Sequence, residues 1–320
     1  MYVGFDIGGT TIKYGVLDET GAILEKNMLP TNYDPQSFYQ NLITIINEAK
    51  SRYPIAGIGI SAPGIVQKDG LMLTAGAIKP LYGENFKTTL EECCGLPVSV
   101  ENDANAAAIA EKWIGNAQSF SNYLCLVLGT GVGGGIVVND QVYRGAHGMA
   151  GEFGWMVIDA LPSTGNSEEV SINRKAAVVD GLVRIYNQKG GQLAGFQATT
   201  DAREIFQRAQ MGETLAETVT QQFLTDLSVG LINLISCFDP EAILIGGGIS
   251  ANPYFFERLQ QTLTTVETQH AAINYLRGKT IAPVLPAKLQ NDAGLIGAVY
   301  QIHQQLTRYI MVYSSYTLMG

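Results

Sequence analysis

Short apolar runs alternate with stretches of helical period along the chain, and this alternation predicts an α/β fold. The apolar runs have the length of buried strands and occupy residues 2–5, 12–17, 56–60, 98–100, 123–128, 136–138 and 242–245. Apolar residues at helical spacing predict helices at 37–52, 86–94, 104–113, 202–209, 214–238 and from 291 to about 306. The tail at 309–320 is apolar and aromatic without a helical period, so an edge strand and a dimer contact both stay open.

The first two apolar runs flank Gly8 and Gly9, which predict a tight hairpin turn. Glycine leaves backbone N–H groups open to a phosphate, because no Cβ stands in the way. Thr10 adds a hydroxyl donor, and Asp6 at the strand end could hold a water molecule on Mg²⁺. The segment is therefore interpreted as a phosphate clamp, with a plain hairpin as the alternative.

A second glycine-rich turn between two apolar runs occurs further along the chain. The run at 123–128 leads into Gly129-Thr130-Gly131 and three more glycines at 133–135, which precede the run at 136–138. Two such clamps, one near the start of each half, are what a nucleotide bound between two similar lobes requires. The run at 242–245 leads into Gly246-Gly247-Gly248, where a bare backbone could let an adenosine lie flat. Walker A and dinucleotide-binding glycine patterns do not occur in their proper sequence context.

Length and composition are typical of two globular domains. A chain of 320 residues exceeds a usual single core. Its 29 acidic residues outnumber 20 Lys and Arg, for a net charge of −9, which argues against a nucleic-acid or anionic-membrane partner. No apolar stretch reaches membrane-spanning length and the start of the chain lacks signal-peptide features, so we expect a cytoplasmic protein. The cysteines lack metal-ligand spacing; Cys125 and Cys237 are expected in the core, and Cys93 and Cys94 at a helix end.

Asp103 lies at a predicted strand-to-helix junction, within Glu101-Asn102-Asp103-Ala104-Asn105. Open α/β sheets keep their ligands at the carboxyl ends of the strands. Asp103 is therefore either a helix N-cap, or a general base that takes a proton from a hydroxyl while Asn102 binds neighbouring hydroxyls. The two clamps favour the base, because phosphoryl transfer to an alcohol needs such a group near the γ-phosphate.

Together these segments resemble the ROK family (repressor, open reading frame, kinase) of the sugar kinase, Hsp70 and actin superfamily. The motifs that carry the resemblance are Asp6-Ile-Gly-Gly-Thr10, Ala62-Pro63-Gly64, Glu101-Asn-Asp-Ala-Asn105, Leu128-Gly-Thr-Gly131, Gly148-Met-Ala-Gly-Glu152, Asp239-Pro-Glu241 and Gly246-Gly-Gly248. The resemblance implies two actin-like (ribonuclease H-like) lobes, formed by residues 1–118 with about 292–320 and by residues 119–291, and it suggests a homodimer. ATP and Mg²⁺ would lie in the cleft between the lobes, and the γ-phosphoryl group would pass to a sugar hydroxyl, usually the one on C6.

The resemblance also implies roles for individual residues. Asp103 would be the catalytic base, and Gly64, Asn102 and Glu152 would bind the sugar. The remaining motif residues would contact the nucleotide and its Mg²⁺: Asp6, Gly8, Gly9, Thr10, Thr11, Gly129, Thr130, Gly131, Gly247 and Gly248.

The chain departs from the family at its zinc site. The usual E-x-G-H pattern carries a histidine that contacts the sugar and ligates zinc together with a C-x-C-G-x-x-G-C loop. Here Trp155 follows Glu152-Phe153-Gly154 and the cysteine loop is missing, so no zinc is expected. His147 is interpreted as a loop residue, and residues 160–170 as a short polar loop in place of the zinc loop.

Trp155 also changes the expected sugar pocket. Its aromatic face could stack on a second ring, which would make the acceptor a β-glucoside or another disaccharide. The alternative is that Trp155 only fills the space left by the zinc loop.

We therefore expect an ATP-dependent kinase of glucose or a β-glucoside. An N-acetylmannosamine kinase and a catalytically silent sugar-binding protein are the alternatives. A repressor of the same family would need an N-terminal helix-turn-helix domain, and Asp6 stands too early in this sequence to leave room for one.

Overall fold

The computed structural model describes the backbone of residues 1–317 and the side chains of residues 1–307. The chain forms two compact units. The first comprises Met1–Ser119, Val142–Ala150 and the described residues from Asn291 onward, and the second comprises Phe120–Gln141 and Gly151–Gln290. Residues 142–150 thus group with the first unit, whereas the predicted lobe boundaries place them in the second lobe. The lobes as functional domains stay a prediction.

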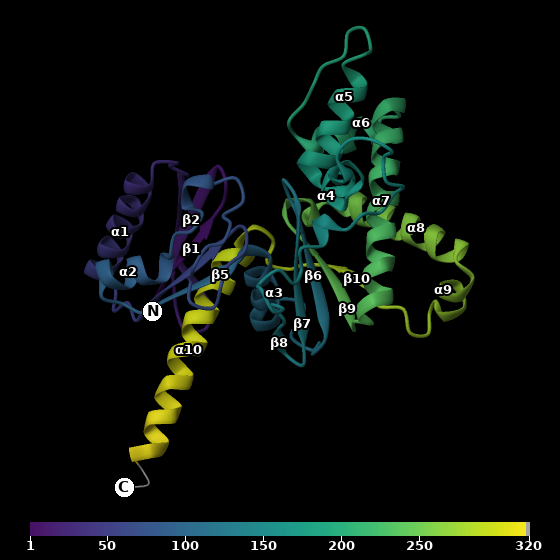
Figure 1. The fold of residues 1–320 in the computed structure, drawn as a ribbon. Helices are drawn as coiled ribbons and strands as arrows, with labels where there is room; N and C mark the ends of the chain where they lie inside the picture. Colours follow the sequence, from purple (N-terminus) through teal and green to yellow (C-terminus); the bar gives the residue numbers. More distant parts are fainter. Residues whose placement is uncertain (318–320) are drawn as a thin grey trace. The chain divides into compact units, whose positions relative to one another are not determined.

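The first unit is built on a five-stranded sheet in the order β3-β2-β1-β4-β5; β1, β2 and β5 are labelled in Figure 1. Its strands are β1 (Tyr2–Ile7), β2 (Thr11–Leu17), β3 (Ile23–Pro30), β4 (Gly57–Ala62) and β5 (Val98–Asn102). β2 is antiparallel to β1 and β3, whereas β1, β4 and β5 run parallel. The carboxyl ends of the parallel strands therefore lie at one edge, with Asp6 paired to Ser61 and Ala62 paired to Asn102.

Helices cover both faces of this sheet. They are α1 (Pro35–Arg52), α2 (Phe86–Cys94), α3 (Asp103–Ile114) and α10 (Ala293–Thr317), with a short 3₁₀ turn at Lys79–Leu81. Side chains alternate along β1, so that Val3 and Phe5 join the core that includes α1 while Gly4 faces α10. A Cβ on Gly4 would lie 2.8 Å from the side chains of Leu295 and Val299, so the bare glycine lets α10 lie directly on the sheet.

The second unit repeats this strand order. Its sheet runs β10-β9-β6-β7-β8, with β6 (Tyr123–Leu128) in the centre. The other strands are β7 (Val132–Val138), β8 (Gln141–Val142), β9 (Ala242–Gly246) and β10 (Val284–Pro286). β6 is antiparallel to β7 and parallel to β9, which is parallel to β10. Each sheet thus places an antiparallel hairpin on one side of its first strand and parallel strands on the other, and the predicted α/β class is confirmed.

The helices of the second unit fall mainly between β8 and β10 in sequence. They are α4 (Ile172–Ala176), α5 (Arg184–Gly190), α6 (Ala202–Gln210), α7 (Thr214–Phe238), α8 (Pro253–Gln269) and α9 (Ala271–Leu276). Shorter turns of this unit are η2 (Phe153–Trp155), η3 (Ser167–Val170), η4 (Val178–Val183, a π-helical turn) and η5 (Gly248–Ala251). The turn η6 (Gln290–Asp292) spans the point in the sequence where the second unit ends and the first resumes. The predicted apolar stripe of α7 is buried along its middle, from Val219 to Leu234, but Phe238 at its end is 41% exposed.

Several sequence predictions need correction. Residues 133–135 belong to β7 and not to a loop. Cys237, expected in the core, is exposed on the last turn of α7. Helix α10 continues to Thr317, because neither Gly nor Pro occurs between Gly297 and Thr317, so an edge strand at 309–317 is wrong. The rest of the predicted tail, 318–320, lies outside the described residues. Helices α4, α5, α8 and α9 were not predicted.

Among the described residues, no helix combines the length and the apolar character that crossing a membrane requires.

Candidate active site

The predicted base, Asp103, lies on a turn that the side chain of Asn102 holds in place. Asn102 Oδ1 accepts hydrogen bonds from the N–H groups of Ala104 (3.0 Å) and Asn105 (3.1 Å), so Asn102 caps α3. Its Nδ2 donates to the carbonyl of Gly64 at 2.9 Å. Asp103 is the first helical residue, and its Oδ1 accepts from the N–H of Ala104 at 2.8 Å. The N-cap interpretation of Asp103 is therefore wrong, and Gly64, Asn102 and Asp103 are brought together.

Directly before this turn lies a buried carboxylate for which sequence analysis predicted no role. Glu101 is 5% exposed, and its Oε1 accepts from the N–H of Asn102 and from Asn105 Nδ2, both at 3.1 Å. Its Oε2 accepts from Arg144 Nε and from Gln301 Nε2, also both at 3.1 Å, and forms an ion pair with Arg144. The Glu101 carboxylate thus connects β5, α3, α10 and the segment 142–150.

Asp6 lies at the same sheet edge and has two partners within the first unit. Ser61 Oγ donates to one carboxylate oxygen and Lys13 Nζ to the other, both at 3.0 Å. Lys13 also donates to the carbonyl of Asn291. The hairpin register sets Lys13 opposite Asp6, which is the signal that could have identified Lys13 from the sequence. One strand separates Asp6 from Glu101, a spacing of about 10 Å for ordinary sheets.

The first glycine turn directs its carbonyl groups into the protein. It spans residues 8–10, one residue more than a two-residue hairpin. The carbonyl of Gly8 accepts from Thr31 Oγ1 (2.6 Å), that of Gly9 from the Tyr33 hydroxyl (2.6 Å), and that of Thr10 from the N–H of Thr31 (3.0 Å). In a trans peptide the C=O and the following N–H point in opposite directions. The next N–H groups along the turn therefore point away from these donors, as a phosphate clamp requires.

The second glycine turn is built in the same way. The carbonyl of Gly129 accepts from the N–H groups of Val178 (3.0 Å) and Val179 (3.2 Å), and the carbonyl of Thr130 accepts from the N–H of Asp180 (3.1 Å). These donors are the start of η4, a π-helical turn of a kind that often occurs at functional sites. The N–H groups of Thr130 and Gly131 therefore point away from η4.

The third glycine segment lies beside the second. β6 and β9 are parallel, with Val127 paired to Gly246, so the turns after both strands emerge at one sheet edge. A Cβ on Gly247 would lie 2.2 Å from the carbonyl oxygen of Leu128, and Gly247 has φ +86°. Only glycine suits both conditions, and the second unit thereby places residues 129–131 next to residues 247–248.

The sugar-side segment packs on the glycines of β7. A Cβ on Gly134 would lie 2.1 Å from the ring of Phe153, so the glycine makes room for the residue after Glu152. Contact with the Phe153 ring, rather than with a phosphate, therefore explains why residue 134 is glycine. Among the described residues the Glu152 carboxylate has no hydrogen-bonding or ionic partner, and burial raises the pKa of Glu152. Trp155, at the end of η2, is 53% exposed.

Comparison with known proteins assigns the family. The family model described as "ROK family" matches residues 2–305. The chain belongs to the ROK family. It is 35% identical over 309 residues to the beta-glucoside kinase of Listeria monocytogenes, an alignment that covers 95% of this chain and 98% of that protein. Among solved structures, a Streptomyces griseus ROK glucokinase in complex with glucose and AMPPNP has a TM-score of 0.76 and 31% identity, covering 93% of this chain and 97% of that one. A Listeria monocytogenes protein for which N-acetylmannosamine kinase activity is suggested has a TM-score of 0.82 and 34% identity, covering 95% of this chain and 99% of that one.

The Streptomyces griseus relative is a ROK glucokinase and shares the actin-like fold, so the predicted fold and family are both confirmed.

In this ROK chain, backbone hydrogen bonds join the two ends of the loop that follows Trp155. Val157 and Ser171 form an antiparallel bridge, and the N–H of Ile172 donates to the carbonyl of Met156 at 2.9 Å. Most of residues 160–170 are exposed, as expected for a polar loop, and so is His147. No group of three or more His, Cys, Asp or Glu side chains suited to a metal ion occurs within the described residues. The absence of zinc stays a prediction.

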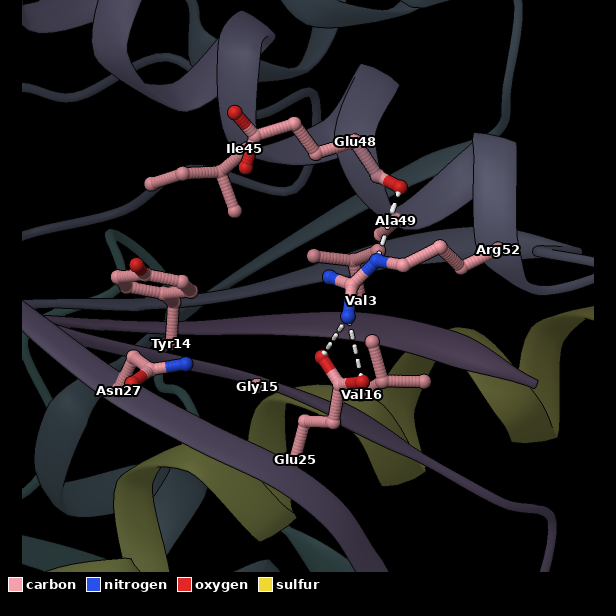
Figure 2. Close-up of a pocket in the computed structure, with 10 residues that line it drawn as sticks. All are labelled: Val3, Tyr14, Gly15, Val16, Glu25, Asn27, Ile45, Glu48, Ala49 and Arg52. Carbon is pink, nitrogen blue, oxygen red and sulfur yellow. Dashed lines mark hydrogen bonds and ion pairs between the residues drawn. The ribbon is translucent and has the colours of Figure 1, made fainter.

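One pocket of the ROK chain lies apart from the predicted residues. It has a volume of about 60 Å³, and Figure 2 shows Arg52 and Glu25 paired at its wall, beside Tyr14 and Asn27. Typical small-molecule pockets measure roughly 300–1,000 Å³, so this one is too small for a sugar or a nucleotide. None of the predicted site residues lines it.

Proposed function

We propose that this ROK protein is an ATP-dependent kinase that transfers the γ-phosphoryl group of ATP to the C6 hydroxyl of a β-glucoside. The observation that carries the proposal is the turn at Asn102 and Asp103. Its backbone is fixed by the Asn102 cap and by the buried Glu101, and it presents a carboxylate at the carboxyl end of a parallel strand. Such a position suits a general base, because the base has to be held within hydrogen-bond reach of the hydroxyl.

In the proposed reaction Asp103 accepts the proton of the sugar hydroxyl as its oxygen attacks the γ-phosphorus of ATP. The bond from that phosphorus to the β,γ-bridging oxygen breaks, and ADP leaves with the electron pair. The products are a sugar phosphate and ADP, and the proton passes from Asp103 to solvent. Asn102 has one Nδ2 hydrogen bond to Gly64, so its second Nδ2 hydrogen is available to a neighbouring sugar hydroxyl.

The two glycine turns are suited to the phosphates of ATP. In both turns protein donors tie the carbonyl groups, so the intervening N–H groups are fixed as donors for anionic oxygens. Asp6 could hold Mg²⁺ through water, and Lys13 supplies a positive charge beside it. When bound, Mg²⁺ would neutralise charge on the phosphate oxygens during transfer.

The exposure of Trp155 supports a β-glucoside over free glucose. A tryptophan that only filled the space of a lost zinc loop would be buried, whereas Trp155 is 53% exposed, three residues after Glu152. An exposed indole offers an apolar face on which a second ring could stack. The similarity to a beta-glucoside kinase points the same way. The relative with suggested N-acetylmannosamine kinase activity keeps that sugar as a second candidate acceptor.

A Trp155→Ala variant tests the acceptor. Stacking predicts that KM for cellobiose rises about tenfold, the equivalent of about 1.4 kcal/mol, while KM for glucose stays within about twofold. Leu161→Ala is the matched control, since Leu161 is an exposed apolar residue of the same loop, at 66% exposure. Wild-type enzyme that prefers glucose strongly over cellobiose, or equal changes for both sugars in Trp155→Ala, would contradict the stacking role.

A further inference from the structure

The side-chain amide of Asn173, in α4, lies against two glycine motifs that are distant in sequence. Its Oδ1 accepts a hydrogen bond from the N–H of Val132 at 2.6 Å. A Cβ on Gly154 would lie 2.2 Å from the same oxygen, and a Cβ on Gly131 would lie 3.1 Å from it. One amide therefore contacts both the second phosphate turn and the segment that follows Glu152.

These contacts give a reason for glycine at both positions. The three heavy atoms nearest to a Cβ on Gly131 all belong to the Asn173 amide. A Cβ on Gly154 would meet that amide and also the carbonyl oxygen of Val132, at 2.5 Å. The turn, the sugar-side segment and α4 are thus packed around one polar group, whose acceptor satisfies the first N–H of β7.

Building on the proposed function, we propose that Asn173 is a positioning residue for phosphoryl transfer. Its amide sets the distance between the phosphate turn at Gly131 and the sugar-side residue Glu152, so that both act on substrates held in one geometry. No family motif found in the sequence includes Asn173. Reactions of this type depend on placement, and an error of about 1 Å can cost about a hundredfold in rate.

The test is a set of double-mutant cycles between Gly131 and Asn173. Gly131→Ala forces the amide to move by a few tenths of an ångström, so it should weaken binding of Mg²⁺ with AMPPNP and lower kcat. Asn173→Ala should do the same, by between about ten- and a hundredfold in kcat. The double variant should be no worse than Asn173→Ala alone, because the added methyl group then has room.

Two further variants distinguish positioning from general damage. Asn173→Asp keeps an oxygen at the position of Oδ1, so Gly131→Ala should keep its full penalty in that background. Gly129→Ala, where a Cβ would meet nothing within 4 Å, should combine multiplicatively with Asn173→Ala. Melting temperatures of all variants check that they are folded.

AMPPNP affinity is measured by calorimetry and does not require turnover, so the cycles decide the inference even if the proposed acceptor is wrong. If the penalties of Gly131→Ala and Asn173→Ala on AMPPNP affinity multiply in the double variant, the inference is overturned. Wild-type protein that binds AMPPNP but phosphorylates no sugar would instead refute the proposed function.

Discussion

Replacing Arg144 by methionine should destabilise the first unit through the buried carboxylate of Glu101. Methionine keeps much of the apolar stem of Arg144 but removes the guanidinium, leaving Glu101 with the neutral donors Asn102, Asn105 and Gln301. Breaking a buried ion pair by removing one partner costs about 3–5 kcal/mol. The Arg144 side chain is 31% exposed, so water screens the pair in part and we expect about 2–3 kcal/mol.

Thermal unfolding followed by circular dichroism measures this effect. For a unit of this size, 1 kcal/mol shifts the melting temperature by about 2–4 °C, so Arg144→Met should lower it by about 4–12 °C. Arg52→Met is the matched control, because it breaks the ion pair between Arg52 and Glu25 that Figure 2 shows. The side chains of Arg52 and Glu25 are 51% and 28% exposed, respectively. That variant should melt almost like the wild type.

A second substitution tests the cause. Glu101→Gln in the Arg144→Met background removes the unpaired charge and should restore most of the lost stability. If Arg144→Met melts like Arg52→Met, or if the double variant melts below Arg144→Met alone, the account of Glu101 as a buried, charge-paired connection is refuted.

Five further predictions concern the site. Asp103→Asn should lose turnover by at least about a hundredfold and keep sugar binding in calorimetry; an active variant would remove Asp103 from the base role. Because burial raises the pKa of Glu152, the acid-side fall of kcat/KM for the sugar should begin above the usual glutamate range, and Glu152→Gln should abolish that dependence. Burial disfavours the ionised form of Glu152, so Glu152→Gln should also raise the melting temperature at pH values above the pKa of Glu152 in the folded protein. Well below the pKa of Glu152 in the unfolded chain, the substitution should leave the melting temperature unchanged. Equal gains at the two pH values would contradict a raised pKa. Lys13→Met should raise KM for ATP more than KM for the sugar. Treatment with a zinc chelator followed by added Mg²⁺ should leave activity intact. A loss of activity that only zinc restores would show that the chain binds zinc.

The elements that follow from local pattern were predictable. Strand β6 and helix α7 begin and end where the apolar runs indicated, because each buries one continuous face or stripe. Helix α8 was missed although Asn252 and Pro253 form an ordinary helix start, with Asn252 accepting from the N–H of Tyr254 at 3.0 Å.

The contacts that hold the site could not be predicted in the same way. Glu101 is bound by Arg144, 43 residues away, and by Gln301, 200 residues away. Asn173 reaches Val132 across 41 residues. Such pairings depend on the order of strands in each sheet and not on the spacing of residues along an element. The glycines of β7 show the converse: as a motif they indicated phosphate, and in the structure Gly134 accommodates Phe153.

The most direct test of the central claim is a phosphorylation screen with purified protein, ATP and Mg²⁺. Cellobiose, gentiobiose, glucose, mannose, N-acetylmannosamine and N-acetylglucosamine are offered separately, with ADP release and phosphorus NMR of the product as readouts. The proposed function predicts ADP release above the sugar-free control, fastest with the β-linked disaccharides, and a phosphate on C6. Release no faster than in the sugar-free control with every sugar, while Asp103→Asn behaves like the wild type, would contradict the assignment as a sugar kinase.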